Sequence, residues 1–443
     1  MYVQRVDLKN IRSFKSFEMT FEAPYAGWHV VIGDNATGKS TLLRSIALGF
    51  MPRVDLAKLF IGDLLSVDSP KGEIKVILES DPQYDIWSKN GIHKTALWLN
   101  RESSDFFNTS VRIESLIKLE ENNIIESKEK INKPFRRYPG IWEQHSGWFC
   151  SSYGSFRRID SQKKIFSSSN LEKIQDNDPF LLPHISLFDL NFIFSNLITW
   201  LQELKFRQLE GKNEKTLVFL LKLINEGDLL ATGFKIADVS SEGVLFETPQ
   251  GAIVPIIQLS DGYRSILSTV FDIIYQMLLK YGEERVFHQV SKGKMEIDLP
   301  GIVLIDEIDA HLHPSWQVRI GKWFTQFFPK IQFIVTTHSP LICQSAHPGS
   351  IWRLAAPDSQ APSGEVTGSD YNRLIYGNVL DAYGTDLFGK DVERSSEASD
   401  LLDELAQLNL TALQTALKPA QKKRRQALQA LLPDSASFLD GVE

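Results

Sequence analysis

The sequence contains few cysteines and no long uninterrupted run of apolar residues. Cys150 and Cys343 are the only cysteines among 443 residues, which excludes a disulfide framework and a cysteine-based zinc site and fits a reducing compartment. The most apolar helical stretch, residues 266–279, is interrupted by polar residues and is too short to span a bilayer. Residues 1–21 alternate apolar and polar side chains, unlike the apolar core of a signal peptide. We therefore expect a cytoplasmic protein with no membrane partner.

An excess of basic residues is also missing. The formal net charge is -7, which excludes a surface that is basic all over, as in proteins that coat DNA, and leaves room for a local basic groove. The densest basic run is Lys422–Arg425. On a helix this run forms either a solvated face or a binding site for phosphate or an acidic partner. Direct contact with DNA or RNA therefore stays open, either through a local patch or through a partner protein.

Sustained heptads and nuclease motifs are absent as well. A charged, helix-like run covers residues 110–131, but its apolar positions do not repeat every seven residues. This excludes a long coiled coil. There is no H-N-H pattern and no acidic cluster that forms a second metal centre, so cleavage of nucleic acid would require a separate nuclease.

The remaining composition, with 43% hydrophobic and 23% charged residues, is that of a globular chain of two to three domains. Short apolar runs predict buried parallel strands, and longer periodic segments predict helices. We expect strands at residues 2–8, 17–21, 28–32, 73–78, 95–99, 234–239, 243–247, 302–305 and 333–336, and helices at 39–48, 189–229, 263–281 and 398–432, the last broken at Pro419.

The first motif is a G-x-x-x-x-G-K-S loop, Gly33–Ser40, that follows a predicted strand and opens a predicted helix. Its glycines let successive backbone N–H groups face phosphate, and the positive end of the helix points at the same anion. Lys39 is expected to reach the β- and γ-phosphates, and the Ser40 hydroxyl is expected to bind Mg²⁺.

The second motif is a pair of acids, Asp306 and Glu307, at the end of the apolar strand 302–305. The carboxyl ends of parallel strands are where open α/β sheets bind ligands. We expect Asp306 to hold Mg²⁺ through water and Glu307 to polarise the attacking water. Taken alone, the pair is also compatible with a strand that ends in solvated acids.

Two further segments are ambiguous by themselves. Leu259–Ser265 is an L-S-x-G turn that opens a long helix, so it is either a capped helix or a second phosphate site. His338 follows a buried strand, where a histidine is usually a satisfied polar residue. His311 and His313 suggest metal ligands, but no third cluster matches them.

Taken in order, these segments resemble the head domains of ABC-type ATPases of the SMC and RecF kind. Gly33–Ser40 resembles Walker A, Leu259–Tyr263 the signature, Ile302–Glu307 Walker B, Asp309 the D-loop and His338 the switch histidine. The resemblance implies catalytic roles for Glu307 and His338, with Mg²⁺ held by Ser40 and Asp306. It implies that ATP is bound by Asn35, Gly38, Lys39, Ser40, Thr41, Ser260, Gly262 and Asp309.

The implied fold class is α/β: an ABC-type P-loop ATPase head with a mixed sheet flanked by helices, a compact and mainly helical insert, and a helical C-terminal tail. The expected divisions are a Walker A lobe at 1–53, an insert or arm region at 54–233 that is partly head strands and partly helical, a second head lobe at 234–354, and a loop and tail at 355–443 that offers a partner docking surface. The position of the usual glutamine loop stays open, with Gln144 as the candidate.

The resemblance also implies a composite site. Two heads of this superfamily enclose two ATP molecules, so Ser260 and Gly262 would meet the γ-phosphate bound by the partner subunit. A homodimer or a higher even oligomer follows. The neighbouring arginines Arg157 and Arg158 have three open readings: a solvated strand end, a phosphate contact across the dimer, or a DNA contact.

Finer features resemble the standalone ATPases of prokaryotic antiphage defence loci, of the Septu and retron-associated type. They are Leu259–Arg264, Glu307–Pro314, Ser152–Arg158 and Tyr383–Lys390. The implied function is a regulatory ATPase, with slow, partner-regulated turnover, that senses an invader and controls a separate nuclease effector. The alternatives are a RecF-like repair ATPase that binds DNA itself, and a nucleotide-gated scaffold with little turnover. A transporter subunit fits the signature and Walker B segments poorly.

Overall fold

The structure is a computed structural model whose described residues fall into two compact units, Met1–Tyr376 and Gly377–Glu443. We describe each unit by itself. The described residues are 1–51, 59, 64–81, 83–85, 91–101, 109–119, 124–125, 148–157, 159, 180–189, 192–212, 215–230, 233–356, 362–377, 382, 387 and 396–432. Gln144, Arg158 and most of Tyr383–Lys390 therefore lie outside them.

A mixed six-stranded sheet forms the centre of the first unit, in the order β15-β14-β3-β13-β12-β8. The strands from β14 to β8 run parallel, and only β15 is antiparallel. Every residue of β3, β12 and β13 is buried, as their continuous apolar runs predict. The strands are β3 (Gly27–Ile32), β8 (Cys150–Tyr153), β12 (Gly301–Ile305), β13 (Ile331–Thr337), β14 (Ile351–Arg353) and β15 (Gly364–Glu365).

A second six-stranded sheet is antiparallel, with the order β2-β1-β4-β5-β6-β7. It consists of β1 (Tyr2–Ile11), β2 (Phe14–Thr20), β4 (Lys71–Glu79), β5 (Gly91–Arg101), β6 (Thr109–Leu119) and β7 (Ile124–Ile125). The helix expected at 110–131 is wrong over its first part, because Thr109–Leu119 pairs with β5 along its whole length. Pairing with the neighbouring strand decides the conformation there, and the local charge pattern does not encode that pairing.

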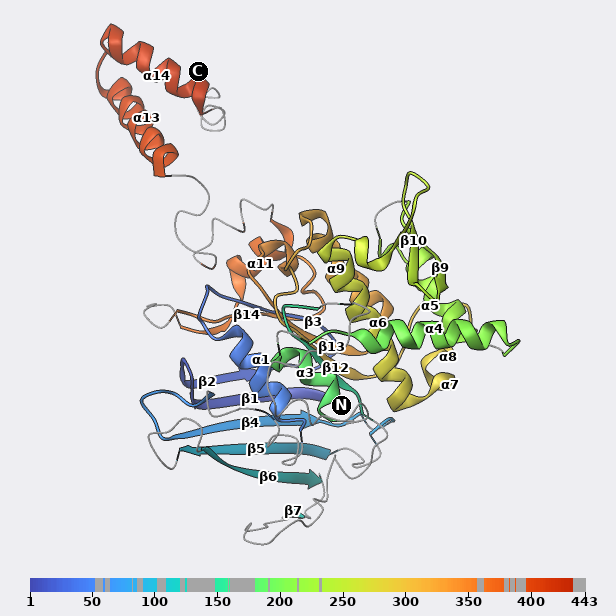
Figure 1. Cartoon of the computed structure of the whole chain (residues 1–443). Coiled ribbons are helices and arrows are strands. Elements are labelled where there is room, and N and C mark those ends of the chain that lie inside the picture. Colours follow the sequence, from blue (N-terminus) through green and yellow to red (C-terminus); the bar gives the residue numbers. More distant parts are fainter. Residues whose placement is uncertain are drawn as a thin grey trace. The chain divides into compact units, whose positions relative to one another are not determined.

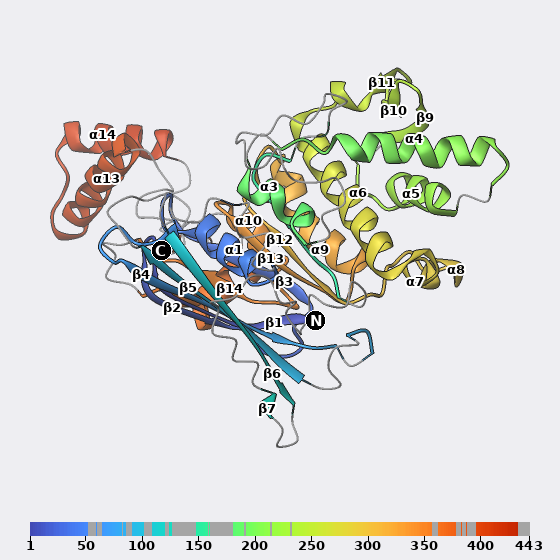
Figure 2. The ribbon, with the colours of Figure 1, turned by 60° about the horizontal axis from the view of Figure 1, so that its bottom comes forward.

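Helix α1 (Lys39–Leu48) lies between the two sheets (Figures 1 and 2). It begins and ends at the residues expected from the sequence, and its C-terminal Gly49 packs closely on Val76 of β4. Helix α9 (Pro314–Phe327) covers the other face of the parallel sheet, where Phe324 stacks on Trp28 of β3. The predicted α/β head, a mixed sheet flanked by helices, is thus confirmed.

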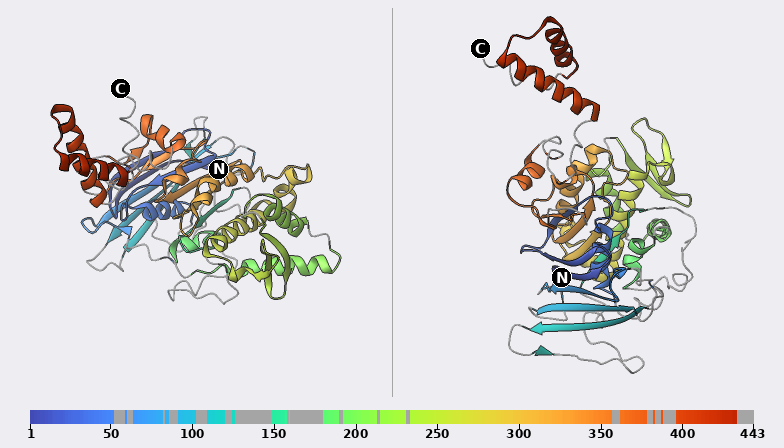
Figure 3. Two further views of the ribbon diagram at one scale, coloured as in Figure 1. Left: turned by 90° about the horizontal axis from the view of Figure 1, so that it is seen from above. Right: turned by 90° about the vertical axis from the view of Figure 1, so that its left-hand side faces the viewer.

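A helical arm lies on the side of this unit opposite the antiparallel sheet (Figures 2 and 3). It contains α3 (Ile185–Phe188), α4 (Ser195–Leu209), α5 (Lys215–Glu226), α6 (Asp261–Tyr281), α7 (Glu283–Val286) and α8 (His288–Ser291), with the small sheet β9 (Lys235–Ser240), β10 (Gly243–Glu247) and β11 (Ile253–Pro255). The mainly helical character expected of the insert holds for α3 to α5, whereas its described N-terminal part is strand.

The second unit contains a helical hairpin of α13 (Ser396–Gln414) and α14 (Pro419–Leu431). The expected helical tail with a break at Pro419 is confirmed: α13 ends at Gln414, and Pro419 begins α14, where proline lacks only an N–H that is unpaired in a first turn. Arg424 binds both carboxylate oxygens of Glu404, at 2.8 and 2.7 Å, and Arg425 donates to Asn409. Half of the basic run thus joins the two helices. In neither unit is any described helix long and apolar enough to cross a membrane.

Candidate nucleotide-binding site

The loop between β3 and α1 has the backbone conformation that the glycine motif requires. Gly38 has a φ of 101°, and a Cβ there would lie 2.7 Å from the Phe14 ring, so only glycine fits. Ala36 also has a positive φ, of 64°. Asn35 is exposed at the tip, Ser40 is half-buried, and Thr41 is buried in the first turn of α1.

The Lys39 side chain is folded back along this loop. Its Nζ donates to the carbonyl oxygens of Gly33 at 2.8 Å and Asp34 at 2.9 Å, and the residue is 6% exposed. Burial lowers the pKa of Lys39, and the negative charges of nearby carboxylates oppose this shift; they are Asp306, Glu307, Asp34 and Asp309. The ammonium therefore lies within electrostatic reach of both acids at the end of β12, as the motif order predicts.

Thr336 of the neighbouring strand β13 forms hydrogen bonds with both Asp306 and Glu307. The Thr336 hydroxyl donates to Asp306 Oδ1 at 2.5 Å and accepts from the Glu307 backbone N–H at 2.8 Å. Glu307 adopts a left-handed φ of 47°, which is unfavourable for a residue with a Cβ. Asp306 is buried at 5% exposure and Glu307 is half-buried. The sequence gives no role to Thr336; only the neighbouring strand register reveals it.

Asp309 and His338 also come together. The His338 backbone N–H donates to Asp309 Oδ2 at 3.4 Å, while the His338 side chain is exposed. Asp309 Oδ1 is buried and has no partner among the described residues. His313, considered above as a metal ligand, instead caps α9 by accepting a hydrogen bond from the Ser315 N–H.

The signature segment forms the first turn of α6. Gly262 packs against the backbone of the loop that follows β12, where a Cβ would lie 2.5 Å from the His311 carbonyl oxygen. Ser260 and Asp261 are exposed, and Asp261 pairs with Arg264. Within the described part of the chain, no hydrogen bond or ion pair joins Ser260 or Gly262 to the Gly33–Ser40 loop.

Arg157 lies just beyond β8 and is buried at 3% exposure. Its guanidinium donates to the carbonyl oxygens of Gly154, Asp306 and Glu307 and to the Ser265 hydroxyl of α6. Burial lowers its pKa to about 10, against the opposing charges of Asp306, Asp309 and Glu307. The solvated strand end considered from the sequence is therefore wrong for Arg157. An arginine in a polar stretch gives no sequence signal that distinguishes this position.

The residues present fit Mg²⁺ and a triphosphate. A serine hydroxyl and one carboxylate are the hard oxygen ligands that Mg²⁺ takes when phosphate and water complete its shell. Ser40 and Asp306 supply them, and the loop that ends at Gly38 opens α1, a helix whose N-terminal end attracts an anion. The unpartnered Asp309 Oδ1 is a further acceptor beside the acids.

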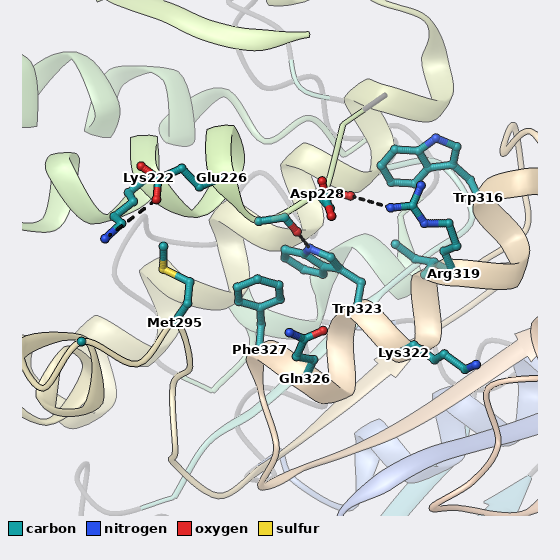
Figure 4. A pocket seen from close by; sticks show the side chains of 13 residues that line it. Lys222, Glu226, Asp228, Met295, Trp316, Arg319, Lys322, Trp323, Gln326 and Phe327 are labelled. Atoms are coloured by element: carbon teal, nitrogen blue, oxygen red, sulfur yellow. Dashed lines mark hydrogen bonds and ion pairs between the residues drawn. The ribbon is translucent and has the colours of Figure 1, made fainter. Parts of the chain in front are cut away.

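A separate cavity of about 530 Å³ lies between α5 and α9 (Figure 4). Its wall carries both signs of charge, and the Trp323 indole N–H there donates to the Gly227 carbonyl at 2.6 Å. Arg319 donates to the Asp228 carbonyl at 3.5 Å. None of the nucleotide-site residues lines this cavity.

A phosphate loop after β3, a pair of acids after the parallel strand β12 and a separate signature helix define a P-loop ATPase head of the ABC type. The family model described as "AAA domain, putative AbiEii toxin, Type IV TA system" matches residues 29–344. The chain belongs to this family. A second model, described as "AAA domain", matches residues 1–53.

The chain is similar to "Septu protein PtuA" of Bacillus mycoides, with 24% identity over 79% of this chain and 40% of that protein. It is also similar to "Retron Vc95 probable ATPase" of Vibrio cholerae, with 24% identity over 76% of this chain and 71% of that protein. The chain thus spans well under half of the Septu protein. Among solved structures, the SMC head domain from Thermotoga maritima matches 83% of this chain and all of that chain, with 12% identity and a TM-score of 0.40. Through its Septu and retron relatives the chain resembles the ATPases of antiphage defence systems.

Proposed function

We propose that this protein binds and hydrolyses ATP and uses the nucleotide to control a second protein. The observation that carries the proposal is that the Gly33–Ser40 loop and the acids Asp306 and Glu307 follow the carboxyl ends of the parallel strands β3 and β12, which are separated only by β13. One cation that reaches phosphate, one carboxylate for Mg²⁺ and one carboxylate for water are the groups that phosphoryl transfer to water requires.

Each group has one task in this proposal. Lys39 would exchange its loop carbonyl partners for phosphate oxygens, and Ser40 and Asp306 would hold Mg²⁺, which would neutralise charge on the phosphates. Glu307 accepts a proton from the attacking water, whose oxygen bonds to the γ-phosphorus while the bond to the β–γ bridging oxygen breaks. The products are ADP and inorganic phosphate. His338, whose backbone N–H binds Asp309, would stabilise the charge that develops on the γ-phosphate.

The site is completed by a second copy of the chain. Ser260 is exposed at the start of α6, a helix end that attracts anions. In the proposed dimer, Ser260 and Gly262 bind the γ-phosphate held by the partner subunit, and two ATP molecules lie between two heads. Hydrolysis removes the bridging phosphate and weakens the dimer, so the nucleotide acts as a switch.

The biological role that fits best is a regulatory ATPase of an antiphage defence system that controls a separate nuclease. Two relatives named for Septu and retron systems support this role. In this proposal residues 1–53 and 234–354 form the ATPase head, 54–233 the insert, and the tail within 355–443 docks the effector. Deleting Gly377–Glu443 is expected to preserve ATP turnover and abolish capture of the effector.

Mixing two inactive variants tests the composite site. Lys39→Ala removes the phosphate lysine, and Ser260→Arg places a bulky side chain where the partner's phosphate would bind. A heterodimer of the two has one site with both defects and one intact site. We expect each variant alone to be inactive and the mixture to recover ATP hydrolysis. No recovery in a mixture shown to form heterodimers would contradict a site shared between subunits, and ATP hydrolysis by Lys39→Ala alone would contradict the nucleotide site itself.

A further inference from the structure

Arg157 connects three segments that are far apart in the sequence. Its Nε donates to Ser265 Oγ at 2.8 Å on α6, and its two terminal nitrogens donate to the carbonyl oxygens of Asp306 at 2.6 Å and Glu307 at 3.1 Å. A fourth bond, 2.7 Å long, goes to the Gly154 carbonyl beside β8. The contacts thus join the end of β8, the acid pair after β12 and the first turns of the signature helix.

These contacts occupy most of the hydrogen-bonding capacity of the side chain. A guanidinium has five N–H donors, and four bonds are made to groups of the same protomer. With 3% exposure, Arg157 cannot reach a phosphate or DNA without giving them up. Arg157 therefore acts within its own head.

One end of this connection holds the proposed catalytic acid. Glu307 has a left-handed backbone, and its conformation is fixed from both sides: Thr336 accepts its N–H, and Arg157 donates to its carbonyl oxygen. Strained backbone of this kind costs on the order of 1–3 kcal/mol and persists only where its surroundings hold it. Losing either partner is expected to let Glu307 relax and to move its carboxylate.

The other end holds the signature helix. Ser265 lies within two turns of Ser260 and Gly262, and the Ser268 hydroxyl of the next turn donates to the Arg157 carbonyl at 3.3 Å. A displacement of the first turn of α6 would therefore change the position of the guanidinium that binds the Glu307 carbonyl oxygen.

The geometry points to Arg157 as a positioning residue that couples the signature helix to Glu307 within one protomer. This inference rests on the proposed function. When Ser260 and Gly262 bind the partner's γ-phosphate, α6 is held in place, and Arg157 transmits that constraint to the general base of its own site. Each head would then hydrolyse its ATP about fivefold faster when its own signature is engaged with the other site.

Two substitutions separate this role from packing. Ser265→Ala removes the bond from the Arg157 guanidinium to α6 and leaves the Arg157 bonds to the acid pair intact. Arg157→Lys keeps a cation but loses the planar fork that spans all four acceptors. For both variants we expect binding of a fluorescent, non-hydrolysable ATP analogue to stay near wild type, while kcat falls about fivefold or more, the usual range for an energetic coupling between sites.

Tyr153→Phe is the matched control. It removes a buried 2.8 Å hydrogen bond between the same two elements, from the Tyr153 hydroxyl of β8 to Asp272 of α6, without touching Arg157 or the acids. We expect its kcat to stay close to wild type. An unchanged kcat in Ser265→Ala, or an equal loss in Tyr153→Phe, overturns the coupling role while leaving the ATPase intact. A wild-type protein that binds ATP without hydrolysing it overturns the proposed function as well.

Discussion

The Thr336 hydroxyl donates a 2.5 Å hydrogen bond to Asp306 Oδ1. The same oxygen accepts the backbone N–H of Glu307 at 2.8 Å. One buried side chain on β13 thereby orients the proposed magnesium ligand and the backbone of the proposed general base, which follow the adjacent strand β12. The parallel register of the two strands, which pairs Ile305 with Val335, creates this arrangement.

Replacing Thr336 by valine tests that arrangement. Valine keeps the volume and branching but leaves the Glu307 N–H without its partner, which costs about 1–3 kcal/mol. We expect kcat for ATP hydrolysis to fall about tenfold, which corresponds to 1.4 kcal/mol, with a smaller effect on ATP affinity. Thr337→Val is the control, because the Thr337 hydroxyl accepts only the Ser339 N–H on the described chain. Equal activity of the two variants would contradict the role of Thr336.

Replacing Lys39 by alanine is expected to abolish ATP binding. Its ammonium is the cation that reaches toward Asp306 and Glu307, and without it the phosphate charge meets the acids uncompensated. Equilibrium binding of a fluorescent ATP analogue measures the loss, and Lys292→Ala, an exposed lysine beyond α8, should bind normally. Retained binding by Lys39→Ala would show that the Gly33–Ser40 loop does not hold the nucleotide.

Glu307→Gln is expected to bind ATP but not hydrolyse it. Glutamine has nearly the same shape and leaves the backbone bonds of residue 307 in place, yet it cannot accept the proton of the attacking water. The ATP-bound dimer should therefore accumulate, as seen by size-exclusion chromatography with light scattering. Glu284→Gln, an exposed glutamate, is the control. Full ATPase activity in purified Glu307→Gln would exclude the role of this residue.

The parts of the fold that local pattern encodes were predictable. Helix α1, the buried strands β12 and β13 and the order of the phosphate-binding motifs follow from periodicity and glycine spacing, and the structure confirms the elements. Strand β6 was not predictable, because the pattern of its charged residues is compatible with a helix as well as with a strand near the edge of a sheet. Pairing with β5 decides between them.

The supporting residues of the site could not be predicted from the sequence for a related reason. Lys39 and Asp306 belong to motifs whose chemistry is visible in the residue types themselves. Thr336 and Arg157 act through backbone groups of other segments, and which segments these are depends on strand order and on the packing of α6. Contacts over such sequence separations leave no local pattern.

Asp272 is expected to give the folded protein a distinct pH dependence. This carboxylate on α6 is fully buried, and burial raises its pKa to about 6 although Tyr153 and Gln276 donate to it. Because the folded pKa lies above the unfolded value of 3.8, the protonated form is favoured on folding. The resulting stabilisation is complete below the unfolded pKa and is lost as the pH rises through about 6.

Asp272→Asn removes this titration and keeps an oxygen that accepts the Tyr153 hydroxyl. We expect the free energy of unfolding of the variant, relative to wild type, to increase by about 2–3 kcal/mol between pH 4 and 7 and to be constant above that. Denaturant titrations at several pH values measure the difference. A difference that does not change across this range would mean that Asp272 ionises in the folded head as readily as in water, so its burial between α6 and β8 would have no electrostatic cost.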